Sequence, residues 1–259
     1  LDAEDALPRD AVKEEDKHKF RVIVPVLPRI SNHTDFDALR LHPDVDFRYI
    51  RMDETIPSTD LIILPGSKSV RDDLEFLRQN NWEHAIKRHV RFGGKVLGIC
   101  GGFQMLGQQI NDELGIEGEP GTSLGLGLLD CETKLLQEKQ LLNRRGKLSF
   151  SDADVQGYEI HVGVTLGDDL SRPVIVAETG NDGAINSDNN IMGTYWHGLL
   201  DTPEAVTDIL SWAGLQSETK VDINKIRETQ IDRLADAFES AIDMDAIMAL
   251  LSLPSSVTS

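Results

Sequence analysis

The sequence has no run of about 18 apolar residues, the length that a membrane-spanning helix needs. Its first residues, Leu1–Asp5, are acidic and carry no apolar stretch, so we expect no signal peptide there. Only two cysteines occur in 259 residues, and neither lies in a CxxC pair or a zinc-binding spacing. The sequence therefore predicts no membrane span, no disulfide framework and no metal site. Free thiols suit a reducing compartment, and we expect a cytoplasmic location.

Basic residues are also scarce, with 26 Lys and Arg against 44 Asp and Glu, and the formal net charge is −18 at pH 7. Such a surface repels phosphate backbones, so we do not expect nucleic-acid binding. Apolar residues make up 40% of the chain, which is enough for the core of one large α/β domain.

Three segments follow from composition. Residues 1–19 are charged and lack apolar periodicity, which predicts a linker or arm. Because the sequence starts with Leu, we expect that arm to continue from a longer protein. Residues 20–215 form the predicted main domain. Residues 216–259 are predicted to be a helical extension packed on that domain, because apolar residues recur at helical spacing across 222–251.

Strands and helices alternate along the main domain. Short apolar or β-branched runs predict strands at 20–26, 45–50, 60–64, 96–99 and 191–196. Helical spacing covers 70–91, with a break near Asn80 and Asn81, and also 102–110 and 203–213. The middle, about 120–190, is richer in glycine and predicts shorter strands and turns. This order predicts a flavodoxin-like, doubly wound, mostly parallel sheet with helices on both faces.

The candidate nucleophile is Cys100, in the string Gly98-Ile-Cys-Gly-Gly102 between a predicted strand and a predicted helix. A nucleophile at such a sharp turn is pushed outward, and the first N–H groups of the helix point at the same space. A thiolate is a strong nucleophile and would form a thioester. The alternative is a small buried residue at a strand end. Cys131 has no such surroundings and is expected in the core.

Among seven histidines, the candidate base is His197, which follows a predicted strand and precedes Gly198. Ligands of open α/β sheets bind at the carboxyl ends of strands, where this residue is expected. A buried structural histidine is the alternative. Another strand-to-loop turn at Ile63–Ser67 could supply the N–H of Gly66 or Ser67, which together with that of Gly101 would form an oxyanion hole. An ordinary Pro-Gly turn would look the same.

Taken together, these motifs resemble a known family. Gly98–Gln104 (GICGGFQ) is similar to the nucleophile turn of class I, triad-type glutamine amidotransferases. GYEIHVG at 157–163 resembles the cobyric acid synthase and cobyrinate diamide synthase branch. LPRISN at 27–32, TDFD at 34–37 and LPGSK at 64–68 are most similar to the cobyric acid synthases.

The resemblance implies a glutaminase domain that supplies ammonia for ATP-dependent amidation of adenosylcobyrinic acid a,c-diamide carboxylates in cobalamin biosynthesis. This sequence has no phosphate-binding loop of the GxxxxGK[ST] type. We therefore expect no cofactor in this domain. ATP, Mg²⁺ and most of the corrinoid contacts are assigned to an N-terminal synthetase domain of the same full-length protein. Gln104, in the nucleophile turn, is expected to shape the glutamine pocket. Tyr158, Glu159 and His161 are expected to line the route toward that partner; the alternative is that they form the core and cap of a hairpin.

One departure concerns the group that orients the base. Many class I amidotransferases carry His-x-Glu, whereas Gly198 and Leu199 follow His197 here. Asp201 and Glu159 are candidates for the missing acid, and a Cys–His dyad is our expectation. Three other functions stay open: a stand-alone glutaminase subunit of another ligase, a non-catalytic interaction module, and a cysteine hydrolase or chaperone on the same sheet.

Overall fold

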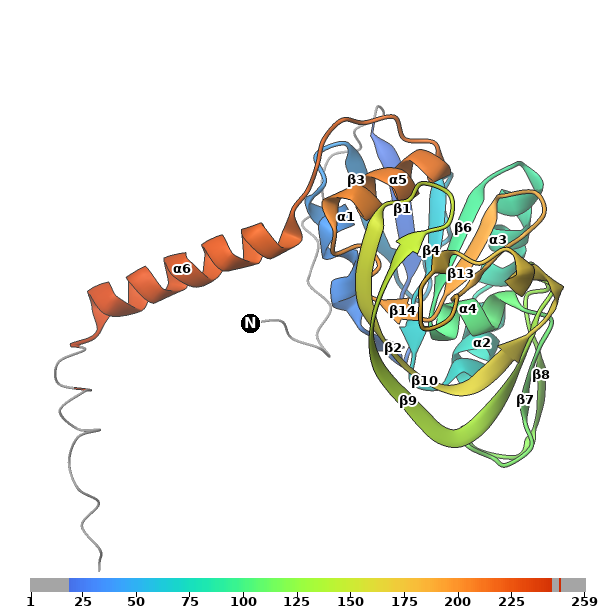
Figure 1. The fold of residues 1–259 in the computed structure, drawn as a ribbon. Coiled ribbons are helices and arrows are strands. Elements are labelled where there is room, and N and C mark those ends of the chain that lie inside the picture. The colour runs from blue at the N-terminus through green and yellow to red at the C-terminus, as the bar shows by residue number, and fades with distance from the viewer. Residues whose placement is uncertain (1–18, 244–246, 248–259) are drawn as a thin grey trace, which may run out of the picture. The chain divides into compact units, whose positions relative to one another are not determined.

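The structure is a computed structural model, and it describes residues 19–243 and 247, without the side chains of 138–140. At its centre is a sheet of six strands (Figure 1). In spatial order they are β12 (Ala184–Ile185), β13 (Ile191–Thr194), β6 (Lys95–Ile99), β4 (Leu61–Leu64), β1 (Phe20–Pro25) and β3 (Val45–Ile50). All neighbours pair in parallel except β12, which runs antiparallel to β13. The flavodoxin-like α/β prediction is confirmed.

The central strands are buried because helices cover both faces of the sheet. On one face lie α2 (Val70–Gln79), α3 (Trp82–Arg91) and α4 (Gly101–Leu106); on the other lie α1 (Asp37–Leu41) and α5 (Pro203–Ala213) (Figure 1). The whole of β4 is inaccessible to solvent, which explains its continuous run of Leu and Ile. Two short 3-10 turns, η1 (His33–Phe36) and η2 (Asp168–Ser171), also occur in this part of the chain.

The predicted break between the first two long helices is confirmed at Asn81, which adopts a left-handed backbone with φ 59°. The helix predicted over 102–110 was too long. It ends at Leu106, and Gln109–Asp112 forms strand β7, which pairs with β9. The apolar spacing of this segment fits either structure, and pairing with a neighbouring strand decides between them.

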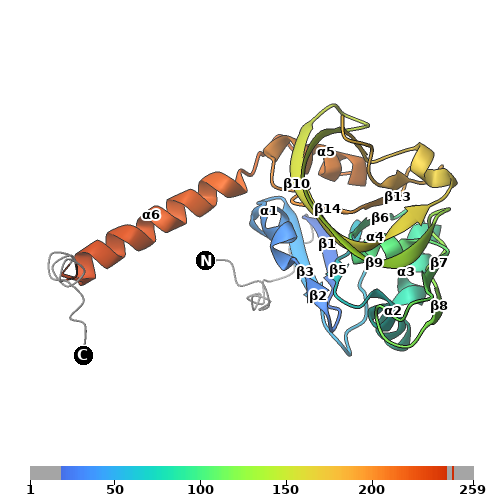
Figure 2. The same ribbon diagram turned by 60° about the horizontal axis from the view of Figure 1, so that its bottom comes forward.

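The prediction of short strands across 120–190 is confirmed for β8, β11 and β12 but was wrong for residues 132–166. Two long strands, β9 (Glu132–Leu148) and β10 (Asp154–Leu166), form an antiparallel ribbon, drawn as long curved arrows in Figures 1 and 2. They belong to a second sheet with the order β14 (Trp196–His197), β10, β9, β7 and β8 (Gly121–Leu124). Strand β11 (Ile175–Val176) pairs with β9, and β2 (Ile30–Ser31) pairs with β5 (Gly66–Ser67).

Residues 222–259 separate from the preceding chain as a second compact unit, within which α6 spans Ile223–Ala241. The Asp222 side chain caps this helix by accepting a hydrogen bond from the N–H of Lys225. Packing of the extension on the main domain stays a prediction, and the predicted arm at 1–19 lies outside the described residues except for Lys19. No helix of the described chain is long and apolar enough to cross a membrane.

Candidate active site

Cys100 sits at the sharp turn between β6 and α4. Its backbone has φ 52° and ψ −109°, a region that residues other than glycine rarely adopt. Its N–H donates to the carbonyl of Thr194 on β13 at 2.8 Å. The turn closes only because Gly102 has no side chain: a Cβ there would lie 2.1 Å from the Leu64 carbonyl oxygen. The predicted strand-to-helix turn around the cysteine is therefore present.

His197 is brought to this turn by β14, and its side chain is 1% exposed. Nδ1 lies 2.7 Å from Oδ2 of Asp35, and the N–H of Gly198 donates to the other carboxylate oxygen at 3.0 Å. Asp35 comes from η1 and is itself buried. Its two oxygens thus hold both the ring and the backbone beside it, which fixes the direction of the imidazole.

The side chains of Cys100 and His197 interact. Nε2 of His197 is buried and has no partner at ordinary hydrogen-bond geometry within the described residues, but the Cys100 side chain interacts with the ring. Burial acts to lower the pKa of His197, and Asp35 and then Cys100 act to raise it, with a net rise from 6.5 to about 10. The Cys100 Sγ also lies 3.6 Å from the Ile160 carbonyl oxygen. The imidazole is therefore protonated at neutral pH, next to the sulfur.

Two expectations about the group that orients His197 were wrong: that the site is a Cys–His dyad, and that Asp201 or Glu159 would be the orienting acid. Glu159 accepts hydrogen bonds from Trp196 Nε1 and Arg144 Nε, at 2.9 and 3.1 Å. Asp201 follows in the turn after the histidine, where its N–H donates to the Gly198 carbonyl. The acid on Nδ1 is Asp35, so the arrangement is a Cys–His–Asp line. Asp35 belongs to the TDFD motif, but nothing in this motif indicates that its carboxylate contacts His197.

Gly66 and Ser67, in β5, lie against the same turn. A Cβ on Gly66 would lie 3.2 Å from Cε1 of His197, and one on Gly101 would lie 2.9 Å from the Ser67 nitrogen. The Lys68 N–H donates to the Arg29 carbonyl at 2.9 Å, so the next pair of this ladder, Ile30 with Ser67, is a non-hydrogen-bonded pair. This alternation directs the Ser67 N–H away from β2 and uses that of Gly66 in the ladder.

Gln104 is buried on α4. Its Nε2 donates to the Val162 carbonyl at 3.1 Å and to the Tyr195 hydroxyl at 3.2 Å. These two bonds fix the amide so that its nitrogen faces β10. The side chain is therefore a rigid part of the wall next to the nucleophile.

The remaining predicted residues divide between the two faces of β10. Tyr158 is directly opposite His197, and their rings stack with centroids 5.3 Å apart. Glu159 and His161 project from the other face, where they line a cavity of about 240 Å³. There His161 stacks on Tyr195 with centroids 3.7 Å apart. Tyr158 thus lies on the same face of β10 as the Cys100–His197 pair. Glu159 and His161 lie on the opposite face, away from that pair.

Two further predictions concern Cys131, which was expected in the core, and metal binding, which was not expected. Cys131 is buried, and burial, with the nearby acids, raises its pKa to about 12. Within the described residues, no group of three or more His, Cys, Asp or Glu side chains could hold a metal ion.

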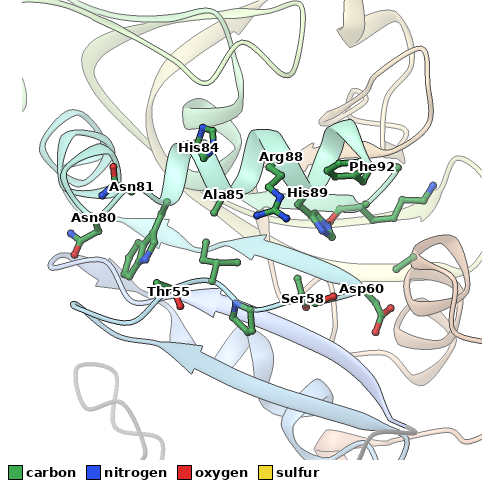
Figure 3. A pocket seen from close by; sticks show the side chains of 18 residues that line it. Thr55, Ser58, Asp60, Asn80, Asn81, His84, Ala85, Arg88, His89 and Phe92 are labelled. Carbon is green, nitrogen blue, oxygen red and sulfur yellow. The ribbon is translucent and has the colours of Figure 1, made fainter.

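A larger cavity of about 760 Å³ lies at the opposite end of the central strands, between α3 and the segment from Thr55 to Asp60 (Figure 3). Arg88 and His89 point from the helix toward that segment. Lys95, which lines it, begins β6, whereas Cys100 follows the end of that strand. None of the predicted site residues lines this cavity.

Comparison with known proteins agrees with this geometry. Residues 21–205 match the profile of the CobB/CobQ-like glutamine amidotransferase domain. The fold is similar to PurLQS from Thermotoga maritima, with a TM-score of 0.58 and 19% identity over 75% of this chain and 99% of that one. It is also similar to a solved glutamine amidotransferase, with a TM-score of 0.55 and 16% identity over 75% and 99% of the two chains. The chain therefore belongs to the family of CobB/CobQ-like glutamine amidotransferase domains.

Proposed function

We propose that Cys100, His197 and Asp35 release ammonia from glutamine by way of a covalent thioester. The observation that carries the proposal is the continuous line from the Asp35 carboxylate, through His197 Nδ1, to the Cys100 side chain. A ring whose pKa is about 10 takes the thiol proton, which leaves sulfur as the nucleophile. Asp35 holds the ring in place and stabilises its positive charge.

The thiolate attacks the side-chain amide carbon of glutamine, and the carbonyl oxygen becomes an oxyanion. The N–H groups of Ser67 and Gly101, from the two neighbouring segments that border the sulfur, stabilise the oxyanion. His197 then gives its proton to the departing nitrogen, and ammonia leaves as the thioester forms. Finally the ring takes a proton from water, whose oxygen attacks the thioester. The carbon–sulfur bond then breaks, which releases glutamate and restores the thiolate beside the protonated ring. Gln104 shapes the glutamine pocket, and Tyr158 covers His197.

The proposed destination of the ammonia is a synthetase domain of the cobyric acid synthase type. That domain would precede this one in the full-length protein, bind ATP and Mg²⁺, and hold the corrinoid substrate. In support, three motifs shared with the cobyric acid synthases lie around the site. TDFD supplies Asp35, while LPRISN and LPGSK contribute the paired strands β2 and β5. A free nucleophilic thiol also suits the reducing cytoplasm.

The test uses the full-length enzyme and adenosylcobyrinic acid a,c-diamide. Cys100→Ala should abolish amidation with glutamine but keep amidation with ammonium salts, whereas Cys131→Ala should keep both. Loss of both activities in Cys100→Ala would contradict the proposed division of labour. Amidation of a different acceptor by a separate ligase would favour the stand-alone subunit. Wild-type protein that 6-diazo-5-oxonorleucine does not label on Cys100 would favour a non-catalytic module.

A further inference from the structure

Asp73 is a buried carboxylate that the mechanism above does not use. It lies in the first turn of α2 and is inaccessible to solvent. The Ser67 hydroxyl donates to it at 2.6 Å, and the Arg29 N–H is shared between its two oxygens at 3.3 and 3.2 Å. Burial raises the pKa of Asp73, while the bonds from Ser67 and Arg29 act to lower it. A buried carboxylate is costly to retain, so its partners are of interest.

Those partners are the two strands that border the nucleophile. Arg29 immediately precedes β2, and Ser67 ends β5. The Ser67 hydroxyl also accepts a hydrogen bond from the Ser69 N–H at 3.0 Å. Asp73 therefore fixes the Ser67 side chain and the start of the neighbouring strand with one carboxylate.

The peptide between Gly66 and Ser67 is the part of β5 that needs such an anchor. Its N–H is directed away from β2, and a Cβ on Gly101 would lie 2.9 Å from its nitrogen. In the ladder the Gly66 carbonyl of this peptide pairs with the Ser31 N–H, but the ladder is only two residues long and Gly66 has no side chain to resist rotation. If the peptide rotated, its carbonyl would replace the N–H at the oxyanion.

We propose that Asp73 is a positioning residue for glutamine hydrolysis: through the Ser67 hydroxyl it holds the Ser67 N–H toward the oxyanion. This inference rests on the proposed function. Among the described residues, no hydrogen bond or ion pair joins Asp73 to Cys100 or His197. Asp73 therefore affects stabilisation of the transition state and not the reactivity of the Cys100 sulfur.

The experiment measures glutamine hydrolysis by Asp73→Ala. We expect kcat to fall about 10- to 100-fold, because an N–H that points in the wrong direction gives up part of the oxyanion stabilisation that deleting it would remove entirely. KM should change less than about threefold, since the oxyanion exists only after attack. Alkylation of Cys100 by iodoacetamide, which forms no oxyanion, should keep its wild-type rate. A fall in the alkylation rate in step with kcat would overturn the proposal, because it would show general damage to the site.

Three variants separate positioning from folding. Asp73→Asn keeps an acceptor oxygen for Ser67 and should retain kcat within about fivefold. Ser67→Ala should lose as much as Asp73→Ala, and the double variant should lose no more than either single one. Asp72→Ala is the matched control: this neighbouring carboxylate is half exposed and pairs with the Arg29 side chain and the Ser69 hydroxyl but not with Ser67, so kcat should stay within about twofold.

A wild-type kcat in Ser67→Ala overturns the inference even if Asp73→Ala fails to fold, and so does an equal loss in Asp72→Ala. Hydrolysis that requires Cys100 but not Asp73 overturns this inference alone. Equal hydrolysis by wild type and Cys100→Ala would instead overturn the proposed function.

Discussion

Asp35→Asn removes the negative charge beside His197 while nearly preserving the size of the side chain. In the folded protein the pKa of His197 rises from 6.5 to about 10, against the lowering effect of burial, and Asp35 is the main group that raises it. Since one pKa unit corresponds to about 1.4 kcal/mol, the net stabilisation of the protonated ring is about 5 kcal/mol. Without the carboxylate, burial should hold the ring neutral at neutral pH.

The variant should lose about 10²- to 10⁴-fold in kcat for glutamine hydrolysis, because a neutral, unanchored ring neither takes the thiol proton nor keeps its orientation. Glutamate release, coupled to glutamate dehydrogenase, measures this loss. Iodoacetamide alkylation of Cys100 at pH 6 gives a second, independent measurement. It should slow by at least about tenfold, because the sulfur keeps its proton.

Asp37→Asn serves as the control, since this nearby acid pairs with Arg40 on the same short helix. We expect its kcat and its alkylation profile to match those of the wild type. Wild-type kcat together with an unchanged pH profile in Asp35→Asn would refute the reasoning, because the 2.7 Å contact with His197 would then have no chemical consequence.

Three further predictions concern stability and reactivity. Because the folded pKa of His197 is raised from 6.5 to about 10, its contribution to the free energy of unfolding should be complete below pH 6.5 and vanish as pH rises through about 10. Urea unfolding of wild type and His197→Gln across this pH range tests this prediction. A difference in unfolding free energy that does not change with pH would contradict it. Gly102→Ala should cost about 3 kcal/mol in unfolding free energy, because its Cβ would lie 2.1 Å from the Leu64 carbonyl oxygen. Gly121→Ala, which would meet only the Arg71 side chain, should cost under about 1 kcal/mol in the same urea assay. Iodoacetamide at pH 8 should label Cys100 in the folded protein but Cys131 only after unfolding, since the Cys131 pKa is about 12; equal labelling by mass spectrometry would refute this.

The parts that sequence predicted well are those determined locally. The turn at Cys100 follows from closely spaced glycines between a buried strand and a helix, and the break at Asn81 follows from a residue that tolerates positive φ. Strands β1 and β4 carry short apolar runs because they lie inside the sheet, whereas β3 (VDFRYI), at the sheet edge, alternates apolar residues with Asp46 and Arg48.

The parts that it missed depend on contacts far apart in the chain. Asp35 lies 162 residues before its partner His197, in a short 3-10 turn with no periodic signal. Strand β9 carries many polar residues. Strand β10 alternates apolar and polar residues from Tyr158 to Leu166, but a register shift between Val162 and Val164 leaves Val164 and Leu166 exposed, so the pattern does not reveal the length of the ribbon. The last turn of the predicted helix after Cys100 became β7, because pairing with β9 overrides a local preference that does not distinguish the two.

The chain order of the Asp35, Cys100 and His197 cluster has a consequence for biosynthesis. A ribosome delivers the acid first, the sulfur next and the imidazole last, and β14 cannot join β10 until the chain has been made past residue 197. A nascent or prematurely terminated product therefore lacks the base. Unfinished copies of this domain would therefore not hydrolyse glutamine in the cell.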